Sequence, residues 1–257
     1  MNPERRVRRD SPQTLTDRQV QTLIDRIDQI PDYTRLRAEH DVLVRLRDKA
    51  LIALAWIFFK RGNEILKVKR SEVTVTDQEL LVTFRIQKKA KAYRVCPECG
   101  DKNARRAIYC KTCGCDISMT PLTKLAREDT VVTKRKSLSF PFCRYVTDWI
   151  GIIDALELKP KIRVQAHIFP PFHFAGFSWK KHLTVQRFDQ ILQRLDPTLT
   201  SHMFRYGATE KLLILGYTPY EAKEIGDWAS SRMPEEYAKR KGLTISQRQY
   251  AQDTRLL

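Results

Sequence analysis

The sequence lacks an apolar run long enough to cross a membrane. Its longest apolar stretch, LIALAWIFF (51–59), is too short for a bilayer and predicts a buried helix. A secretory signal is also missing, because the basic start MNPERRVRRD has no apolar segment behind it. Internal repeats and low-complexity linkers are absent too. These absences exclude an integral membrane protein and a repeat array, and they predict a soluble, cytoplasmic protein with no membrane partner.

Cysteine is scarce, with six residues in a chain of 257. Without a secretion signal the thiols are expected to stay reduced, and Cys-x-x-Cys pairs then favour metal binding over disulfides. Two such pairs stand in CPECGDKNARRAIYCKTCG (96–114), each followed by a glycine that permits a left-handed turn. They predict a zinc ribbon over residues 95–116; reduced thiols in a loop are the alternative. The predicted ligands of one Zn²⁺ are Cys96, Cys99, Cys110 and Cys113.

Four thiolates complete a tetrahedral coordination shell and leave no open position for water, so the zinc is expected to be structural. No catalytic metal or nucleotide cofactor is expected. Cys115 is a fifth thiol, which either replaces one ligand or remains outside the site. Cys143, in the apolar segment FPFCRYV, is predicted to lie in the core.

Negative charge is scarce relative to positive charge. The chain has 47 lysines and arginines against 30 acidic residues, which gives a formal net charge of +17. A surplus of this size favours a polyanionic partner, above all nucleic acid. Solubility alone and anionic lipid are the alternatives.

A β-hairpin is predicted around the ribbon. Side chains alternate in ELLVTFRIQKK (79–89), and DTVVTKRKSLSF (129–140) has the composition of a second strand. The turn between them is then expanded to carry the ribbon. A solvated charged loop is one interpretation of the basic hairpin rim, and a DNA-backbone contact is the other. The basic rim residues are Lys88, Lys89, Lys91, Arg94, Lys102, Arg105, Arg106, Lys134, Arg135 and Lys136.

The remaining chain is predicted to be mostly helical, which gives a mainly α fold with a small antiparallel sheet (α+β). Thr16 and Gln19 have the spacing of a capping box at the start of one helix. Thr200 or Ser201 can cap a later helix, and Thr218 caps the one after it. The other predicted helices cover 43–59, 142–156 and 184–195, begin near Pro234, and cover 245–257.

Several polar residues stand at positions that suit chemistry. His202 and Arg205 are three residues apart and share one face of a predicted helix. Trp228 and Tyr237 follow at a spacing of nine, and Arg61 ends the apolar helix upstream. Each of these features alone is more often a surface pair or a packing residue than a site.

In this order, the segments resemble the tyrosine recombinase (phage integrase) family. FFKRGNEILKV (58–68) is similar to the family's arginine box, SHMFRYGAT (201–209) to its HxLRHTFAT box, and IGDWASSRMPEEY (225–237) to its LGHxS…Y box. The resemblance runs from about residue 13 to 250 and is interrupted by the ribbon. It implies a catalytic set of Arg61, a hairpin lysine, His202, Arg205, Trp228 and Tyr237. Lys88 is the first choice for the lysine, with Lys89 and Lys91 left open.

The resemblance implies a site-specific recombinase that cleaves double-stranded DNA through a 3′-phosphotyrosyl link, without ATP. It further implies a homotetramer on DNA that is linked through the C-terminal segment. The implied domains are a basic arm (1–12) and a catalytic domain (13–257) with the ribbon (95–116) inserted. Tyr206 departs from the family's second histidine. Only about a dozen residues precede the first predicted helix, where the family usually has a DNA-clamping domain, so the basic arm, the ribbon or a partner is expected to take its place, or the chain is a fragment. The alternatives are an idle zinc-ribbon DNA-binding protein on this scaffold and a type IB topoisomerase-like enzyme.

Overall fold

The computed structural model describes residues 15–31, 33–34, 37–87, 92–124, 129–156, 158–163, 165–173, 176–228 and 230–240. The chain divides into two compact units. The first comprises Met1–Phe84 and Thr133–Leu257, and the second comprises Arg85–Val132. The predicted basic arm, the lysines at 88, 89 and 91, and the predicted helix 245–257 lie outside the described residues.

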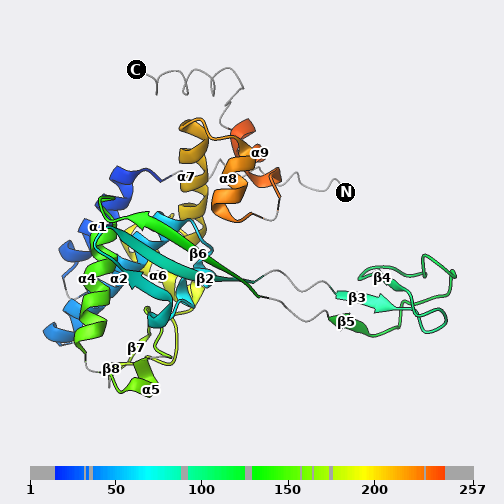
Figure 1. Ribbon diagram of the computed structural model, residues 1–257, viewed down its shortest axis with the longest axis horizontal. Helices are drawn as coiled ribbons and strands as arrows, with labels where there is room; N and C mark the ends of the chain where they lie inside the picture. The colour runs from blue at the N-terminus through cyan, green and yellow to red at the C-terminus, as the bar shows by residue number, and fades with distance from the viewer. Residues whose placement is uncertain are drawn as a thin grey trace, which may run out of the picture. The chain divides into compact units, whose positions relative to one another are not determined.

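The first unit is mainly helical (Figure 1). Its helices are α1 (Asp17–Gln29), α2 (Ala38–Phe58), α3 (Gly62–Leu66), a 3₁₀ turn η1 (Arg70–Glu72), α4 (Cys143–Ala155), α5 (Pro160–Arg163), α6 (Val185–Leu195), α7 (Ser201–Ile214), α8 (Pro219–Gly226) and α9 (Arg232–Arg240). The predicted capping box at the start of α1 is confirmed, with Thr16 and Gln19 exchanging hydrogen bonds. Helix α2 begins at residue 38, earlier than predicted.

Helix α2 forms the centre of the first unit. It is buried along most of its length and packs against α1, α4 and α7. Trp56 on α2 and Trp149 on α4 are almost fully buried, and Cys143 lies in the core as predicted. The end of α2 leads into Phe59, a non-glycine residue in the left-handed conformation with φ 57°. The helix therefore ends at this residue, and Arg61 follows as the N-cap of α3.

A three-stranded sheet with the order β1-β2-β6 belongs mainly to this unit. It contains β1 (Val73–Val75), β2 (Glu79–Gln87) and β6 (Asp129–Ser137), and β1 pairs antiparallel with β2 with Val73 opposite Val82. Both strands predicted to flank the ribbon are therefore present, although β6 ends earlier than predicted. Two short strands, β7 (Phe172–His173) and β8 (Gly176–Phe177), pair with each other.

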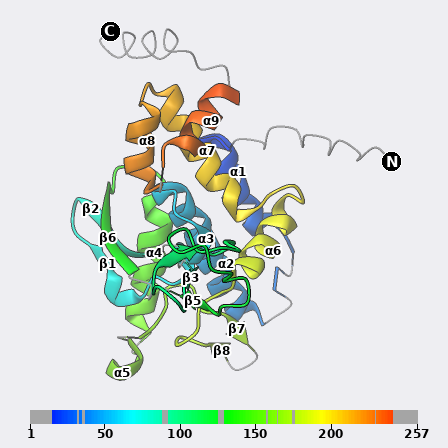
Figure 2. The same ribbon diagram turned by 90° about the vertical axis from the view of Figure 1, so that its right-hand side faces the viewer.

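Helices α7, α8 and α9 contact one another and gather at one end of the first unit (Figures 1 and 2). A small apolar cluster that includes Leu213, Ala222 and Tyr237 holds them together. Helix α7 also lies against the start of α1. A Cβ on Gly207 would be 2.8 Å from the backbone nitrogen of Leu15, so only glycine permits this close approach.

The second unit contains β3 (Ala92–Val95), β4 (Lys102–Ala104) and β5 (Leu122–Lys124), in the order β4-β3-β5. Both neighbours of β3 run antiparallel to it. Its small core consists of Cys96, Cys110 and Ile117. Within the part of the chain that the structure describes, no helix is long and apolar enough to span a membrane.

Candidate active site and metal centre

Arg205 lies at the centre of the end formed by α7, α8 and α9. Its side chain projects from α7 and is 1% exposed. Nη1 donates to the carbonyl of Phe59 (3.1 Å) and Nη2 to the carbonyl of Gly226 (2.8 Å). Burial, followed by the nearby charge of Arg61, lowers the pKa of Arg205 to about 10, so the guanidinium stays charged at neutral pH. The guanidinium thus joins the end of α2 to the end of α8.

Trp228 and Tyr237 lie against this arginine and against each other. The Cζ of Arg205 is 3.9 Å from the centroid of the Trp228 ring, a cation–π distance. The rings of Trp228 and Tyr237 are edge to face, with centroids 6.1 Å apart. Gly226 leaves room for the indole, since a Cβ there would be 2.7 Å from the Trp228 Nε1.

Tyr206 connects Tyr237 with His202. Its ring centroid lies 4.9 Å from that of Tyr237 and 4.5 Å from that of His202, and both contacts are edge to face. The sequence indicated only that Tyr206 departs from a family pattern. The structure gives it a packing position between two predicted site residues. We call His202, Arg205, Tyr206, Trp228 and Tyr237 the aromatic–arginine cluster.

Two buried donors of this cluster have no hydrogen-bond partner within the described ranges. They are the Nε of Arg205 and the Nε1 of Trp228. Buried N–H groups are nearly always paired, with protein, water or ligand. An unpaired N–H of a buried guanidinium, next to an unpaired indole N–H, is typical of a site that binds an anionic group.

Arg61 stands where α2 and α3 meet. Glu64 accepts from its Nη1 (2.8 Å) and from its backbone nitrogen (3.1 Å), which fixes the side chain over the first turn of α3. The turn packs closely on α7, because a Cβ on Gly62 would be 3.3 Å from the Oγ of Ser201. The charge of Arg61 acts on the pKa of both His202 and Arg205. The predicted arginine is thus brought to the cluster from a distant segment.

His202 is neutral at physiological pH. Desolvation, followed by the positive charges of Arg205 and Arg61, lowers its pKa below the usual 6.5, while Asp189 opposes the shift. A neutral imidazole can accept a proton, which a protonated one cannot.

Three charged residues near the cluster were assigned no catalytic role from the sequence. Lys60 has a side chain that is 0% exposed, and its amine contacts the Oδ2 of Asp227. Lys134 on β6 lies 3.2 Å from the same oxygen. Lys134 was predicted only as a basic rim residue, and Lys60 and Asp227 had no sequence signal, because the partners of Asp227 are far from it in the chain.

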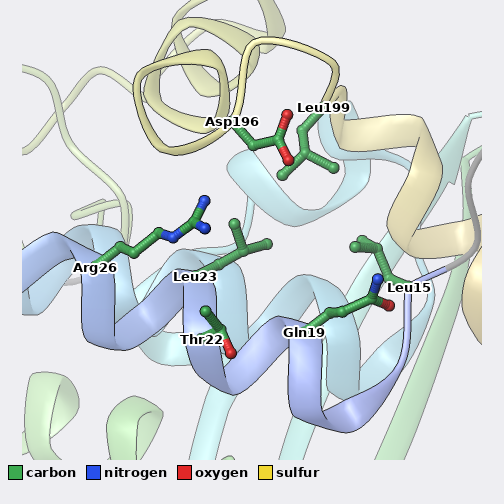
Figure 3. Close-up of a pocket in the computed structure, with 7 residues that line it drawn as sticks. All are labelled: Leu15, Gln19, Thr22, Leu23, Arg26, Asp196 and Leu199. Carbon is green, nitrogen blue, oxygen red and sulfur yellow. The ribbon is translucent and has the colours of Figure 1, made fainter.

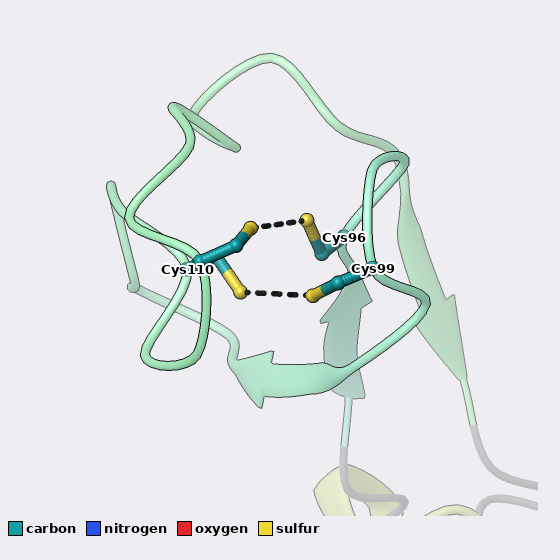
Figure 4. A group of neighbouring side chains, drawn as sticks. Cys96, Cys99 and Cys110 are labelled. Carbon is teal, nitrogen blue, oxygen red and sulfur yellow. Dashed lines mark hydrogen bonds between the residues drawn. The ribbon is translucent and has the colours of Figure 1, made fainter.

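The cysteine pairs form a compact cluster in the second unit (Figure 4). The sulfur atoms of Cys96, Cys99, Cys110 and Cys113 all lie within 4.8 Å of one another. The sulfur atoms of Cys96 and Cys113 are 3.5 Å apart, and those of Cys99 and Cys110 are 3.6 Å apart. Zn–S bonds of about 2.3 Å in a tetrahedron place the sulfurs about 3.8 Å apart. The four thiols therefore fit one zinc ion.

The two backbone loops around these thiols repeat the same turn. Gly100 (φ 73°) donates to the carbonyl of Cys96, and Gly114 (φ 77°) donates to the carbonyl of Cys110. The backbone nitrogen of Thr112 and the side-chain amide of Asn103 each point to the Cys110 sulfur at 3.5 Å, as donors to a thiolate would. The Cys115 sulfur lies 3.3 Å from that of Cys96, so the fifth thiol is in reach of the site.

Some of the basic hairpin residues that the structure describes are exposed, and others contact groups of the protein itself. Lys102, Arg105, Arg106 and Arg135 are exposed. Arg94 donates from Nε to the Arg105 carbonyl (3.2 Å) and from Nη1 to the Ile117 carbonyl (3.2 Å), so it braces the ribbon backbone. The Lys136 amine lies 4.2 Å from the Phe140 ring centroid. Contact of these residues with DNA stays a prediction.

A small cavity of about 180 Å³ lies between α1 and the connection from α6 to α7 (Figure 3). Figure 3 shows its lining by Leu15, Gln19, Thr22, Leu23, Arg26, Asp196 and Leu199. None of these residues belongs to the aromatic–arginine cluster. A second cavity of about 340 Å³ lies between the start of α1 and α7.

No protein-family model matches the chain, and no curated protein matches it. Solved structures do. XerH site-specific recombinase bound to palindromic difH substrate, in a post-cleavage complex, matches at 14% identity with a TM-score of 0.54, over 89% of this chain and 50% of that one. XerA recombinase matches at 12% identity with a TM-score of 0.52, over 92% and 61%. The Tn1549 transposon integrase in complex with transposon right end DNA matches at 12% identity with a TM-score of 0.50, over 89% and 62%.

The chain thus spans half to about three fifths of the length of these structures. At these identities the likeness concerns the fold. The chain has an α+β fold like that of tyrosine recombinase catalytic domains, and the predicted fold class is confirmed.

Proposed function

We propose that this chain is a site-specific DNA recombinase or integrase that cleaves and rejoins strands through a 3′-phosphotyrosyl intermediate, without ATP. The observation that carries this proposal is the position of Tyr237, whose ring contacts Trp228 and Tyr206 beside the buried guanidinium of Arg205. A tyrosine nucleophile, buried cations and unpaired N–H donors are the groups that transesterification of a phosphodiester requires.

In the proposed reaction, the Tyr237 oxygen attacks the scissile phosphorus and the bond to the 5′ oxygen breaks. The new phosphotyrosyl ester keeps the free energy of the broken ester, so no nucleotide is consumed. His202, which is neutral at physiological pH, takes up the tyrosine proton as general base, by way of the Tyr206 hydroxyl or a water, because the Tyr206 ring lies between the two residues. Lys88 donates a proton to the leaving 5′ oxygen, with Lys89 and Lys91 as the other candidates. Attack by the 5′-hydroxyl of a second strand reverses these steps and exchanges strands.

The developing charge on the phosphate is met by the two arginines. Arg61 and Arg205 can bind the two non-bridging oxygens, because the planar guanidinium fork matches their charge and geometry. The buried Nε of Arg205 and Nε1 of Trp228 are available donors for the same oxygens. The preorganised donors lower the barrier because they need no reorganisation as charge develops.

We assign residues 13–257 to the catalytic domain, 1–12 to a basic arm and 95–116 to an inserted ribbon. The four thiols of the ribbon would hold one Zn²⁺, which supplies shape and no chemistry because the coordination shell is closed. The division of the chain at Arg85 and Val132 supports an insertion that folds as its own unit.

Double-stranded DNA is the proposed partner. The net charge of +17 supports it, as do the DNA complexes of XerH and the Tn1549 integrase among the structural neighbours. We further propose a homotetramer in which the segment after residue 240 binds a neighbouring protomer. The cavity between α1 and α7, where Leu15, Ile214 and Leu215 lie beside charged residues such as Asp17, Arg18 and Lys211, offers a receptor for it.

A covalent adduct tests the proposal. The purified protein is mixed with supercoiled plasmid that carries its own flanking DNA, in dilute EDTA without added metal, and the reaction is quenched with SDS. We expect a protein–DNA adduct that disappears in Tyr237→Phe. Tyr220→Phe is the matched control, because Tyr220 is 64% exposed on α8 and should leave the adduct unchanged.

The products separate the alternatives. Recombinant plasmid supports the recombinase, whereas relaxation without recombinants indicates a topoisomerase-like enzyme. Tight binding of that DNA without adduct or topological change would leave the idle DNA-binding protein and overturn the proposal.

A further inference from the structure

Asp227 forms ion pairs with two lysines from different parts of the chain. The Lys60 amine, just after α2, contacts its Oδ2, and the Lys134 amine on β6 lies 3.2 Å from the same oxygen. Lys134 also donates to the carbonyl of Ile225 at 3.3 Å. One carboxylate thus connects the end of α2, the end of α8 and the sheet.

Lys60 is buried too deeply for an ordinary surface ion pair. Its side chain is 0% exposed, and its amine lies 5.5 Å from the ring centroid of Phe84 on β2. A charge in such a place is costly unless it is paired. The charged groups that face it are Arg61 and Glu64 at α3, Lys134 on β6, Arg205 on α7 and Asp227 at the end of α8. Among these, Asp227 is the carboxylate in direct contact.

Asp227 occupies the turn that builds the cluster. It ends α8 in the left-handed conformation, with φ 49° and ψ 48°. The residue before it, Gly226, accepts the Nη2 hydrogen bond of Arg205, and the residue after it, Trp228, stacks on the same guanidinium. Rotation of this turn would therefore displace the contacts of Arg205 with Gly226 and Trp228 at once.

We propose that Asp227 is a positioning residue of the site, held by buried Lys60, and that it docks Lys134 of β6 beside Trp228. This inference rests on the proposed function. Lys60 and Asp227 act through Arg205 and Trp228, whereas Lys134 joins the cations around the scissile phosphate. Lys134 is suited to this because its side chain is 26% exposed, in contrast to that of Lys60.

The test uses variants that keep shape and remove charge. Lys60→Met replaces the buried lysine by an apolar chain of similar length, and Asp227→Asn keeps a residue type that tolerates the left-handed conformation. We expect each to lower the single-turnover rate of adduct formation on the order of 100-fold, with DNA affinity unchanged. The double variant should be no slower than the slower single variant, because both changes break the same pair.

Lys134→Ala tests the second lysine that contacts Asp227. Combined with Asp227→Asn, it should lower the rate by less than the product of the two separate reductions. Asp154→Asn is the matched control, because it breaks the comparable ion pair between Arg70 and Asp154 (2.6 Å) away from the cluster. It should leave the rate of the folded protein unchanged.

The outcomes separate this inference from the proposed function. A wild-type protein that forms no adduct refutes the proposed function itself. A wild-type adduct together with wild-type rates in Lys60→Met and Asp227→Asn overturns the inference alone. Equal slowing by Asp154→Asn at matched folded fraction also overturns it, since the effect would then be general.

Discussion

The guanidinium of Arg205 lies over the indole of Trp228, with 3.9 Å between Cζ and the ring centroid. The contact joins two segments that are distant in the sequence, residues 201–209 at the start of α7 and residues 225–237 around the α8–α9 turn. The same guanidinium binds the carbonyls of Phe59 and Gly226, so α7, the end of α2 and the turn after α8 all depend on one side chain.

Arg205→Lys should abolish this junction while keeping the charge. Lysine cannot bind two carbonyls and stack on the ring simultaneously. We expect adduct formation to fall by at least about 100-fold and unfolding free energy to fall by about 1–3 kcal/mol. Quenched-reaction gels and urea unfolding measure the two effects. Wild-type rates in a folded Arg205→Lys protein would contradict the assignment.

The pH dependence of cleavage should report His202. Its pKa lies below 6.5, so the imidazole is neutral at pH 7 and loses its proton-accepting capacity only as the pH falls through that lowered value. Adduct formation should therefore decline on an acidic limb that lies below 6.5. His202→Asn should be slow and lack this limb. The same limb in His202→Asn would assign it to another group.

Lys60 should make stability depend on pH. Burial, followed by the charge of Lys134, lowers its pKa in the folded protein to about 7, whereas the unfolded value is near 10.5. Between these values the unfolded chain binds more protons, so stability contributed at this site rises with pH. Below about 7 the cost of burying the ammonium is present in full. We therefore expect the unfolding free energy of wild type, relative to that of Lys60→Met, to be higher at about pH 9 than at about pH 6; urea unfolding measures it.

Gly207→Ala should destabilise the first unit. The new Cβ would lie 2.8 Å from the nitrogen and 2.9 Å from the oxygen of Leu15, and both are backbone atoms. Overpacking of this kind costs about 1–3 kcal/mol, measured by urea unfolding. Gly151→Ala on α4 is the matched control, since its Cβ has nothing within 4 Å, and helix propensity should then raise stability by about 0.5–1 kcal/mol.

Metal removal should affect the second unit selectively. We expect about one zinc per chain in the purified protein, and loss of that zinc in Cys110→Ser. Limited proteolysis should then cut within residues 85–132 while the first unit stays resistant. Cys143→Ser is the control that keeps its zinc, because Cys143 lies at the start of α4 in the hydrophobic core of the first unit. Full zinc content in Cys110→Ser would argue against the four-thiol site.

Local interactions explain what the sequence predicted correctly. The capping boxes at Thr16 and Thr218 connect residues that are three apart in the sequence. The residue types at these positions therefore determine where α1 and α8 begin. Alternation over 79–87 sets the faces of β2 in the same way. The Cys-x-x-Cys pairs fold into two similar turns for the same reason.

Tertiary structure decided which side chains meet. The sequence identified Arg61, Arg205, Trp228 and Tyr237 only through a resemblance of ordered segments, and the packing of α7, α8 and α9 places three of them in contact.

The sequence by itself determined the cap of α1, the alternating faces of β2 and the two Cys-x-x-Cys turns, because these depend on neighbours a few residues away. Only the tertiary structure decided that Lys60 and Lys134 share Asp227, and that Tyr206 packs between His202 and Tyr237. The physical reason is that the burial of a lysine, and hence its need for a partner, is a property of the folded core.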